Sequence, residues 1–490
     1  MTPSRTGIQD SQRRLFLINP SNPLVTILNF NDSRWNRFRV WKPLGLMTIA
    51  DLTPSDWEVT IIDENIERPD YEQMLAPDLV GITAFTSQAN RAYEIATHFR
   101  SRGIPVVIGG IHATMCLEES QRYADTIVIG EAEKVWGHLL EDFCHNRLKS
   151  QYQGGFADMD RLPPAKHPLS NGKYAFGSIQ TSRGCPLSCS FCSVTAFNGA
   201  RFRQRPIDQV VDDFRGISEK LVLIVDDNLV GTSQKHILRA KNLFRAMVQA
   251  DLKKEWVAQA TINVAKDDEL LALAAAAGCK GLFIGFESPR TDGLKELTKK
   301  NSLCRSDELA ESVHRIQRHG ILVAGSFIIG LDGDRPGIGR NIADTAEHYG
   351  VDFVNVLFLT PLPGTALWDK MEKQRRIVLN HFPEEWSYFT LTYPVARYQG
   401  LTLSEATHEM DICSRRFYSI PRILRRLWRN IYFRQSVRIG LAGGLSYRRN
   451  TRIDRQKLDY YQARYASESS SVDTNEEQQM IRSSPNVVIE

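Results

Sequence analysis

Three cysteines, Cys185, Cys189 and Cys192, stand close together in RGCPLSCSFCSV with the spacing C-x3-C-x2-C. The other cysteines are isolated in the sequence: Cys116, Cys144, Cys279, Cys304 and Cys413. A structural zinc site is usually closed by four ligands in two close pairs, so this triplet would need a remote fourth ligand. Three thiolates can instead hold three irons of a four-iron cube and leave the fourth iron open. The triplet therefore favours a 4Fe-4S cluster over zinc.

Composition limits the class of protein and its compartment. The chain has 490 residues, of which 42% are hydrophobic and 24% charged, which is ordinary for a folded chain of more than one domain. A net charge of +4 gives no reason to expect nucleic acid as a partner. The start, MTPSRTGIQDSQRR, is polar, and the longest apolar runs are about half of a membrane span. We therefore expect a cytoplasmic protein with reduced cysteines.

Two series of apolar segments alternate with helical stretches. The first predicts a doubly wound, flavodoxin-like α/β domain, because runs that are apolar throughout suit strands buried on both faces of a parallel sheet. Its strands are expected at residues 14–20, 58–65, 79–86, 105–110 and 126–133. The second series predicts a partial, open (β/α)6 barrel, because six units fall short of the eight of a closed barrel. Its strands are expected at residues 176–184, 220–228, 255–263, 280–288, 321–331 and 352–362.

The same rhythm sets the expected domain boundaries. The doubly wound domain spans residues 10–150, a proline-containing linker 151–172 and the barrel 173–370. A small helical appendage follows at 371–465, and residues 466–490 have the composition of a disordered tail. The cysteines come directly after the first barrel strand, where loops of such folds bind ligands.

The segment CPLSCSFC resembles the signature of the radical SAM superfamily, and the resemblance extends over residues 175 to 365. It implies that the open iron binds S-adenosylmethionine, whose reductive cleavage yields a 5'-deoxyadenosyl radical that abstracts hydrogen from unreactive carbon. It also implies an electron donor such as flavodoxin or ferredoxin.

Three further segments match this family in the expected order. VDDN stands where polar groups lie near the amino group of S-adenosylmethionine, GFES where the ribose is contacted, and GSFIIGLDGD where the adenine packs. The resemblance assigns contacts with S-adenosylmethionine to Asp226, Asp227, Asn228, Glu287, Gly325 and Gly330. Taken singly, an acidic residue at a strand end is more often a helix cap or a solvated group.

The N-terminal series resembles the cobalamin-binding domain that precedes many radical SAM enzymes. VVIGGIHATMCLEES and ADTIVIGEAE are similar to its GG-x-H-x-T and GE-x-E segments. Cobalamin contacts are therefore expected from Thr83, Gly109, Gly110, His112, Gly130 and Glu131. Gly109 and Gly110 would let the backbone approach a bulky ligand at the carboxyl edge of the sheet, while His112 alone could equally be an ordinary loop histidine.

One departure from related cobalamin domains concerns the lower face of the cobalt. Domains of the mutase and methionine synthase type carry D-x-H-x-x-G after the first strand, and its histidine ligates cobalt. Here that place reads INPSNPLVTILNF, without histidine. We therefore expect the lower face to carry water, another side chain or nothing.

Together the two resemblances imply a radical SAM enzyme that is a cobalamin-dependent C-methyltransferase acting on an unactivated carbon, with methylcobalamin as the donor. Two alternatives stay open. The enzyme could be a non-methylating cyclase or rearrangement enzyme of similar architecture, or its N-terminal domain could be a docking scaffold without cobalamin. The sequence identifies no catalytic residue beyond the cofactor ligands.

The appendage interleaves arginines with apolar and aromatic residues between positions 415 and 438. Such a stretch can lie on an anionic membrane, although it is more often a solvated face packed on its own domain. Peripheral membrane contact would favour a lipid or isoprenoid substrate. A tetrapyrrole, a peptide or another small molecule remains open.

Overall fold

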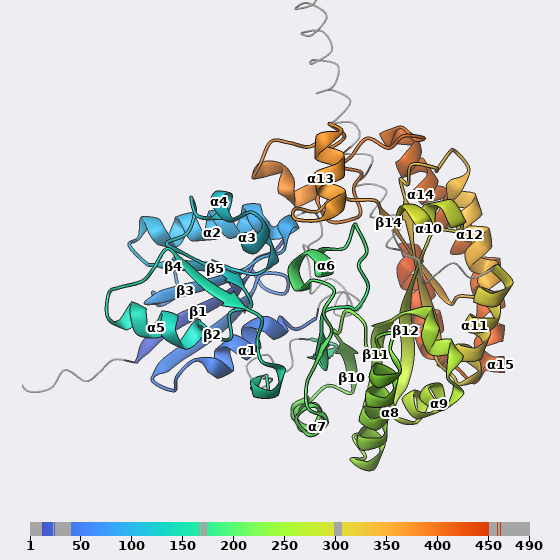
Figure 1. The fold of residues 1–490 in the computed structure, drawn as a ribbon, viewed down its shortest axis with the longest axis horizontal. Helices are drawn as coiled ribbons and strands as arrows, with labels where there is room; N and C mark the ends of the chain where they lie inside the picture. The colour runs from blue at the N-terminus through green and yellow to red at the C-terminus, as the bar shows by residue number, and fades with distance from the viewer. Residues whose placement is uncertain are drawn as a thin grey trace, which may run out of the picture.

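The computed structural model describes residues 12–22, 24, 41–165, 167, 174–297, 306–449, 458 and 461. In Figure 1 the N-terminal α/β domain lies on the left and the second α/β domain, with the C-terminal helices, on the right. The expected tail at 466–490, much of the expected linker and most of INPSNPLVTILNF lie outside the described residues.

The N-terminal domain is built on a parallel sheet with strand order β2-β1-β3-β4-β5-β6. Its strands are β1 (Arg13–Asn19), β2 (Trp57–Asp63), β3 (Leu79–Thr83), β4 (Val106–Gly109), β5 (Thr126–Gly130) and β6 (Gln151–Gly155). The doubly wound fold and its five expected strands are confirmed. The expected linker is wrong at its start, because β6 occupies residues 151–155. As an edge strand β6 alternates buried and exposed residues, so its sequence QYQGG contains no apolar run.

Both faces of this sheet are buried, as its sequence predicts. On β1, Leu15 and Leu17 pack on one side, against α1 (Leu44–Leu52) and α5 (Trp136–Cys144). Phe16 and Ile18 pack on the other side, which α2, α3 and α4 cover. The bounds of these three helices are α2 (Ala89–Ser101), α3 (Ile111–Met115) and α4 (Leu117–Ser120). The helices cover the two faces of the sheet, so the carboxyl ends of its strands are bordered by loops.

The second domain contains a parallel sheet of order β14-β13-β12-β11-β10-β7, so every strand lies beside its predecessor in this domain. The strands are β7 (Gly177–Ile179), β10 (Leu221–Ile224), β11 (Glu255–Ala260), β12 (Cys279–Glu287), β13 (Leu322–Ile329) and β14 (Phe353–Phe358). Its outer helices are α7 (Ile207–Gly216), α8 (Gln234–Gln249), α9 (Asp268–Ala276), α10 (Thr291–Glu296), α11 (Ser306–Arg318) and α12 (Ile338–Tyr349). Because β7 and β14 are the outermost strands, the expected open six-unit barrel is confirmed.

The C-terminal part is helical, as expected, and packs on both domains. Its elements are α13 (Ala366–Lys373), η8 (Glu384–Tyr388), α14 (Leu403–Phe417) and α15 (Ile420–Tyr432). Helix α14 packs on α12, while η8 packs on α2 and on η3 (Thr86–Gln88) of the N-terminal domain. Trp386 of η8 donates a hydrogen bond to Glu119 at 3.0 Å. The C-terminal residues therefore connect the barrel to the first domain. None of the described helices is both long and apolar enough to cross a membrane.

Candidate active site

The three clustered cysteines lie on the loop between the short strand β8 (Ser182–Arg183) and helix α6 (Ser193–Asn198). Strand β8 pairs antiparallel with β9 (Arg203–Gln204), which ties the two ends of this segment together. The backbone N–H of Cys192 donates to the carbonyl of Cys189 at 3.2 Å. All three cysteines are half-buried and free of disulfides. One short loop therefore presents three thiols beside the open barrel.

The surroundings of Cys192 suit a thiolate that binds a cation. Burial raises the pKa of its thiol, while the backbone N–H groups of Thr195 and Val194 lower that pKa by hydrogen bonding. The charges of Asp227 and Cys185 raise it again. None of these largest influences on the Cys192 thiol is a cation, and iron ions would supply positive charge and deprotonate the thiol.

The arrangement argues against a mononuclear zinc site. Among the residues that the structure describes, no three His, Cys, Asp or Glu side chains converge as the ligands of one metal ion do. The thiolates of a cubane bind different irons, so they need not converge on one point. The triplet thus fits a cluster and not a closed zinc site.

Asp226 follows β10 and supports the segment that leads into the cysteines. Its carboxylate is fully buried and accepts hydrogen bonds from the Thr181 N–H and hydroxyl, both at 2.6 Å, and from the Ser182 hydroxyl at 2.7 Å. Burial raises the pKa of Asp226, and these hydrogen bonds oppose the rise. The expected contact of Asp226 with S-adenosylmethionine stays a prediction, which the burial of its oxygens disfavours.

Asp227 and Asn228 hold the cysteine loop itself. Asp227 accepts a hydrogen bond from the Gly184 N–H at 2.9 Å, and burial raises the pKa of its carboxyl to about 6. The amide of Asn228 lies 3.7 Å from the sulfur of Cys185, to which it donates. Asn228 is also buried, so of the three polar residues of the VDDN motif Asp227 alone lines the cavity described below. Asn228 is therefore placed to orient a ligand of the cluster rather than S-adenosylmethionine.

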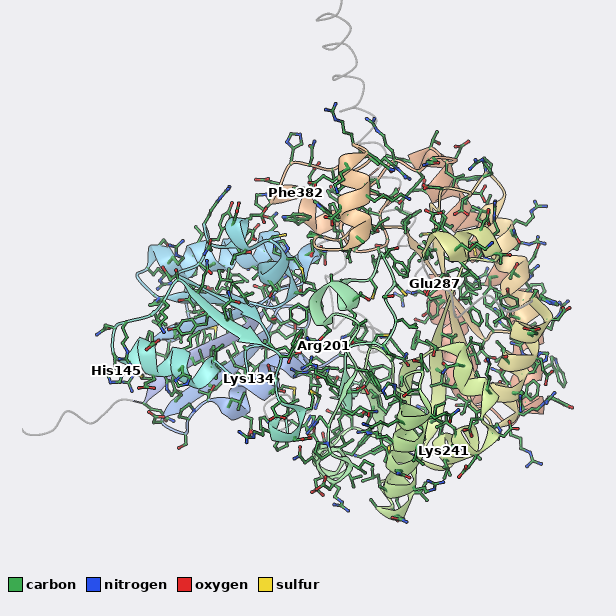
Figure 2. The ribbon with its side chains drawn as sticks, in the orientation of Figure 1. Lys134, His145, Arg201, Lys241, Glu287 and Phe382 are labelled. Carbon is green, nitrogen blue, oxygen red and sulfur yellow. The ribbon has the colours of Figure 1, made fainter. Side chains whose placement is uncertain are left out.

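Glu287 ends β12 in an unusual backbone conformation (Figure 2). Its φ is +65°, and the register between β12 and β13 shifts between Gly285 and Glu287. A residue other than glycine at positive φ costs on the order of 1 kcal/mol and is enriched at ligand-binding sites. The side chain is 8% exposed. Its expected ribose contact stays a prediction, which this local strain favours.

Gly325 and Gly330 make room for aromatic rings of the protein. A Cβ atom at Gly325 would lie 3.1 to 3.2 Å from the rings of Phe286 and Phe327. At Gly330, where φ is +107°, a Cβ atom would come within 2.5 Å of the Tyr398 ring. Both glycines are thus explained by internal packing, and their expected contact with adenine stays a prediction.

A cavity of about 440 Å³ lies between the two domains. The N-terminal domain lines it with the carboxyl ends of its strands, including Thr83, Gly109, Gly110, Gly130 and Glu131. The second domain contributes Gln180, Arg183, Ser193, Val194, Phe197, Asn198, Val225 and Asp227. Open α/β sheets bind ligands at this edge. Helix α6, which follows the cysteines, therefore lines the same cavity as the glycine-rich loops; Figure 1 shows this helix on the side of the second domain that faces the first.

The loops around Gly110 and Gly130 are joined to each other. The hydroxyl of Thr114 donates to the Gly110 carbonyl at 2.9 Å and accepts from the Gly130 N–H at 3.0 Å. Gly110 has φ +91°, and a Cβ atom there would lie 2.8 Å from the Thr83 hydroxyl. A side chain at Gly110 would thus strain the loop before it met any ligand, and the backbone of this loop forms the cavity wall.

His112 is not among the residues that line the cavity, so its expected contact with cobalamin stays a prediction that the structure does not support. It is 1% exposed, and its Nε2 lies 2.9 Å from the Tyr93 hydroxyl and 3.4 Å from Glu119. Its ring packs edge-on against Trp386 at 5.4 Å between centroids. Burial alone would raise the pKa of Glu119, but hydrogen bonds from His112, Tyr93 and Trp386 lower it overall. His112 therefore belongs to a buried network that joins α3 to the C-terminal segment.

Glu131 reaches the cavity, but its carboxylate is engaged by the second domain. It accepts from Arg203, with one oxygen 3.0 Å from Nη1, and from the Ala157 N–H at 2.5 Å. Arg183 lies 3.0 Å from Glu131 and 2.5 Å from Glu133. The two carboxylates of GEAE thus pair with the arginine of TSRGC, two residues before Cys185.

The sequence analysis did not predict this network of ion pairs between the domains. Its acidic and basic residues each stand near the end of a strand, but the sequence does not show that they pair. Burial raises the pKa of Glu131, but Arg203 and Arg183 lower it overall, so the carboxylate stays ionised. Arg201 and Arg203 also lie over the ring of Phe156, at 4.6 and 4.9 Å from its centroid (Figure 2). The network therefore fixes the cysteine loop against the first domain.

The lining of the cavity bears on the lower face of a bound cobalt. Within the described part of the chain, its residues include no histidine, cysteine or methionine. Asn19, at the end of β1, is the described residue of the segment INPSNPLVTILNF that lines this cavity. The expectation of a cobalt without histidine below it remains a prediction that the described lining supports.

Comparison with known families matches both domains. The B12 binding domain matches residues 36–140, and the Radical SAM superfamily matches residues 179–337. The first match contains the strands β2 to β5, and the second contains the cysteine loop and the strands β10 to β13.

Several curated proteins are similar over most of this chain. Bacteriochlorophyllide d C-12(1)-methyltransferase of Chlorobaculum tepidum is 29% identical over 381 residues, which cover 75% of this chain and 80% of that protein. Hopanoid C-2 methylase of Rhodopseudomonas palustris is 28% identical over 346 residues, 69% of this chain and 65% of that protein. Anaerobic magnesium-protoporphyrin IX monomethyl ester cyclase of Cereibacter sphaeroides is 24% identical, covering 75% and 64%.

Solved structures share the fold. The radical S-adenosylmethionine methyltransferase TsrM from Kitasatospora setae, with tryptophan and a SAM analog bound, gives a TM-score of 0.62 at 21% identity, covering 74% of this chain and 76% of that chain. The cobalamin-dependent S-adenosylmethionine radical enzyme OxsB with aqua-cobalamin gives 0.55 at 16% identity, covering 75% and 56%.

Proposed function

We propose that this chain is a cobalamin-dependent radical SAM methyltransferase that adds a methyl group to an unactivated carbon of its substrate. The observation that carries the proposal is the shared cavity between the domains. One hollow is bordered by the glycine-rich loops of the first sheet and by helix α6 behind the cysteines. A substrate in that hollow would face both walls at once.

The cofactors of this family are a 4Fe-4S cluster, S-adenosylmethionine and cobalamin. Cys185, Cys189 and Cys192 would hold the cluster, and the loops at Gly109 and Gly130 would hold cobalamin. When bound, the cluster and S-adenosylmethionine supply hydrogen abstraction, and cobalamin supplies the transferable methyl group.

The chain itself positions these groups and excludes water. Asn228 orients the sulfur of Cys185, and the buried Asp226 fixes the preceding turn. Phe197, Val194 and the apolar ends of the strands give the cavity a mainly apolar lining, which would limit the water around a bound reactive species. This supports radical chemistry on a substrate carbon.

The substrate class and the electron donor are also proposals. The mainly apolar lining suits an apolar small molecule or lipid, and relatives carry the names of tetrapyrrole and hopanoid methylating enzymes. We propose flavodoxin or ferredoxin as the reductant. A non-methylating cyclase is the second candidate, because one relative has that activity in its name.

Glu287→Ala should weaken binding of S-adenosylmethionine by about tenfold or more, because a charged hydrogen bond contributes roughly 1.5–3 kcal/mol. Iron content should not change, because Glu287 lies outside the cysteine loop. Isothermal titration calorimetry on the anaerobic enzyme measures the affinity. Glu287→Gln is the matched control, because residue 287 would keep its positive φ and a side-chain oxygen that accepts a hydrogen bond. It should weaken binding less than Glu287→Ala does. Unchanged affinity in the alanine variant, or lost iron, would show that Glu287 has a structural role.

Cobalamin-loaded protein in the Co(II) state should show no nitrogen coupling from an axial imidazole in its electron paramagnetic resonance spectrum. The reason is that the described lining offers no histidine to the cobalt. A sample with free imidazole added gives the reference spectrum. Nitrogen coupling that changes when the histidines of the protein are labelled with ¹⁵N would contradict the prediction and identify a histidine ligand.

The function is tested by incubating the reconstituted enzyme with S-adenosylmethionine deuterated in its methyl group. Tetrapyrrole and isoprenoid lipid candidates are supplied in turn, with flavodoxin and its reductase as the electron source. Mass spectrometry should find the deuterated methyl group on carbon in one product. Oxidised or cyclised product without the label would favour the cyclase instead.

A further inference from the structure

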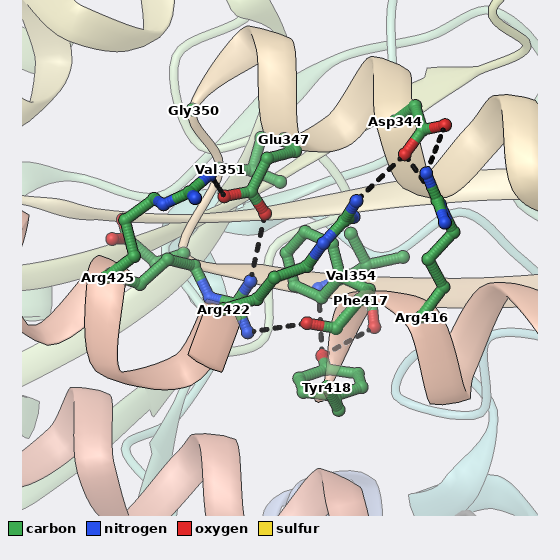
Figure 3. Close-up of polar contacts among 12 residues, drawn as sticks. Asp344, Glu347, Gly350, Val351, Val354, Arg416, Phe417, Tyr418, Arg422 and Arg425 are labelled. Carbon is green, nitrogen blue, oxygen red and sulfur yellow. Dashed lines mark hydrogen bonds and ion pairs between the residues drawn. The ribbon is translucent and has the colours of Figure 1, made fainter. Parts of the chain in front are cut away.

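Three arginines of helix α15, Arg422, Arg426 and Arg429, contact the protein. Arg422 lies 3.0 Å from Asp344, and Arg426 lies 3.2 Å from Glu347 on α12 (Figure 3). Arg426 also donates to the Phe417 carbonyl at 2.9 Å, and Arg429 donates to the Val351 carbonyl at 3.0 Å. The charged side of the helix is therefore its packed side.

The apolar side of α15 faces outward as a consequence. Its exposed residues are Ile420 (45%), Leu424 (53%), Trp428 (75%), Ile431 (56%) and Tyr432 (80%). Their spacing of four, four and three residues places the first four on one helical face. This orientation reverses the usual one, in which the apolar stripe of a helix faces the core.

The helical residues 437–449 extend this surface. Val437, Leu441 and Leu445 are exposed at a spacing of four residues. The second helix packs on α15, since a Cβ atom at Gly440 would meet Asn430 at 2.2 Å. We call these eight exposed residues of the two helices the apolar face. A contiguous apolar surface on a folded chain generally marks a site of contact.

The charge around the apolar face is of one sign. Between Asp411 and Asp454 the sequence contains no aspartate or glutamate, but many arginines. Arg425, Arg434 and Arg438 are exposed near the apolar residues, and Arg425 forms an ion pair with Glu347 at 3.8 Å. The charges that this segment itself places beside the apolar face are therefore positive.

We propose that the apolar face docks on an anionic lipid bilayer surface. Trp and Tyr prefer the boundary between headgroups and acyl chains, apolar side chains enter it, and arginines bind anionic headgroups. A twofold dimer through this face is disfavoured, because it would bring Arg434 and Arg438 of both copies close together. The proposal does not depend on the reaction that the enzyme catalyses.

Sedimentation with vesicles tests the proposal. The full chain should sediment with vesicles of equal phosphatidylcholine and phosphatidylglycerol, and poorly with phosphatidylcholine alone. Trp428→Ser combined with Leu424→Gln should lower the partition coefficient at least about tenfold, since each side chain contributes roughly 1.5–3 kcal/mol when buried. Arg434→Glu with Arg438→Glu should remove the preference for anionic lipid.

Leu238→Gln is the matched control, because Leu238 of α8 is 57% exposed but lies outside the apolar face. It should bind vesicles like the unchanged chain. All variants alter exposed positions, and circular dichroism checks that they fold. Absence of vesicle binding, or equal binding by the Trp428 and Leu424 variant, would overturn the proposal. Light scattering is the second test. A dimer that the unchanged chain forms and the Trp428 and Leu424 variant does not would also overturn the proposal, because the apolar face would then be a protein interface.

Discussion

Alanine at any one of Cys185, Cys189 and Cys192 should lower the iron content of anaerobically reconstituted protein from about four atoms per chain to near zero. Each thiolate binds one iron of the cube, and the loop offers no replacement sulfur. Cleavage of S-adenosylmethionine to 5'-deoxyadenosine should be lost with the iron. Iron analysis, visible absorbance and chromatography of the nucleoside measure the effect.

Cys144→Ala is the matched control for these variants. Cys144 is exposed at the end of α5, on the first domain, and does not belong to the cysteine loop. Its replacement should leave iron and cleavage unchanged. Iron retained by the three loop variants, or stoichiometric zinc in the unchanged chain, would contradict the assignment of the cluster.

Glu131→Ala should destabilise the protein by up to about 3–5 kcal/mol, because Arg203 loses its buried carboxylate partner and Arg183 keeps only its ion pair with Glu133. The loss should appear in denaturant titration as earlier separation of the two domains. Glu141→Ala is the control: Glu141 is 55% exposed, and its ion pair with Arg147 should contribute less than about 1 kcal/mol. Equal effects of the two substitutions would contradict the interdomain role of Glu131.

The contribution of Glu131 to the free energy of unfolding should depend on pH, because folding changes the pKa of its carboxyl. The folded state lowers it from its ordinary value of 4.5. Its contribution is therefore present above that value and is lost as pH falls through the lower folded pKa. The stability gap between Glu131→Gln and the unchanged chain should narrow below pH 4.5.

The fold could be predicted from the sequence because most of its strands are continuous apolar runs separated by helical stretches. Strands buried on both faces appear as continuous apolar runs, and all eleven expected strands are present. The strand β6 could not be found this way, because an edge strand is half exposed and QYQGG has no apolar run. The spacing of the cysteines was equally informative, because three thiols on one loop depend on local sequence alone.

Side-chain roles away from that loop were less predictable. A motif marks Glu131 and His112 as notable, but the pattern does not tell whether a side chain faces a ligand, the interior or a second domain. Glu131 pairs with Arg203, 72 positions later in the sequence, and His112 packs on Trp386. Such pairings depend on tertiary contacts. The arginines of α15 are a further case, since amphipathicity reveals two faces but not which one is packed.

The central claim is that one cavity serves both cofactors, and the fate of S-adenosylmethionine tests it most directly. The reconstituted enzyme, with cobalamin, flavodoxin, its reductase and an accepted substrate, is assayed for two products of S-adenosylmethionine. The account predicts that both 5'-deoxyadenosine and S-adenosylhomocysteine form with the methylated substrate, and that omitting cobalamin abolishes methylation. Methylation that proceeds equally well without cobalamin would contradict it.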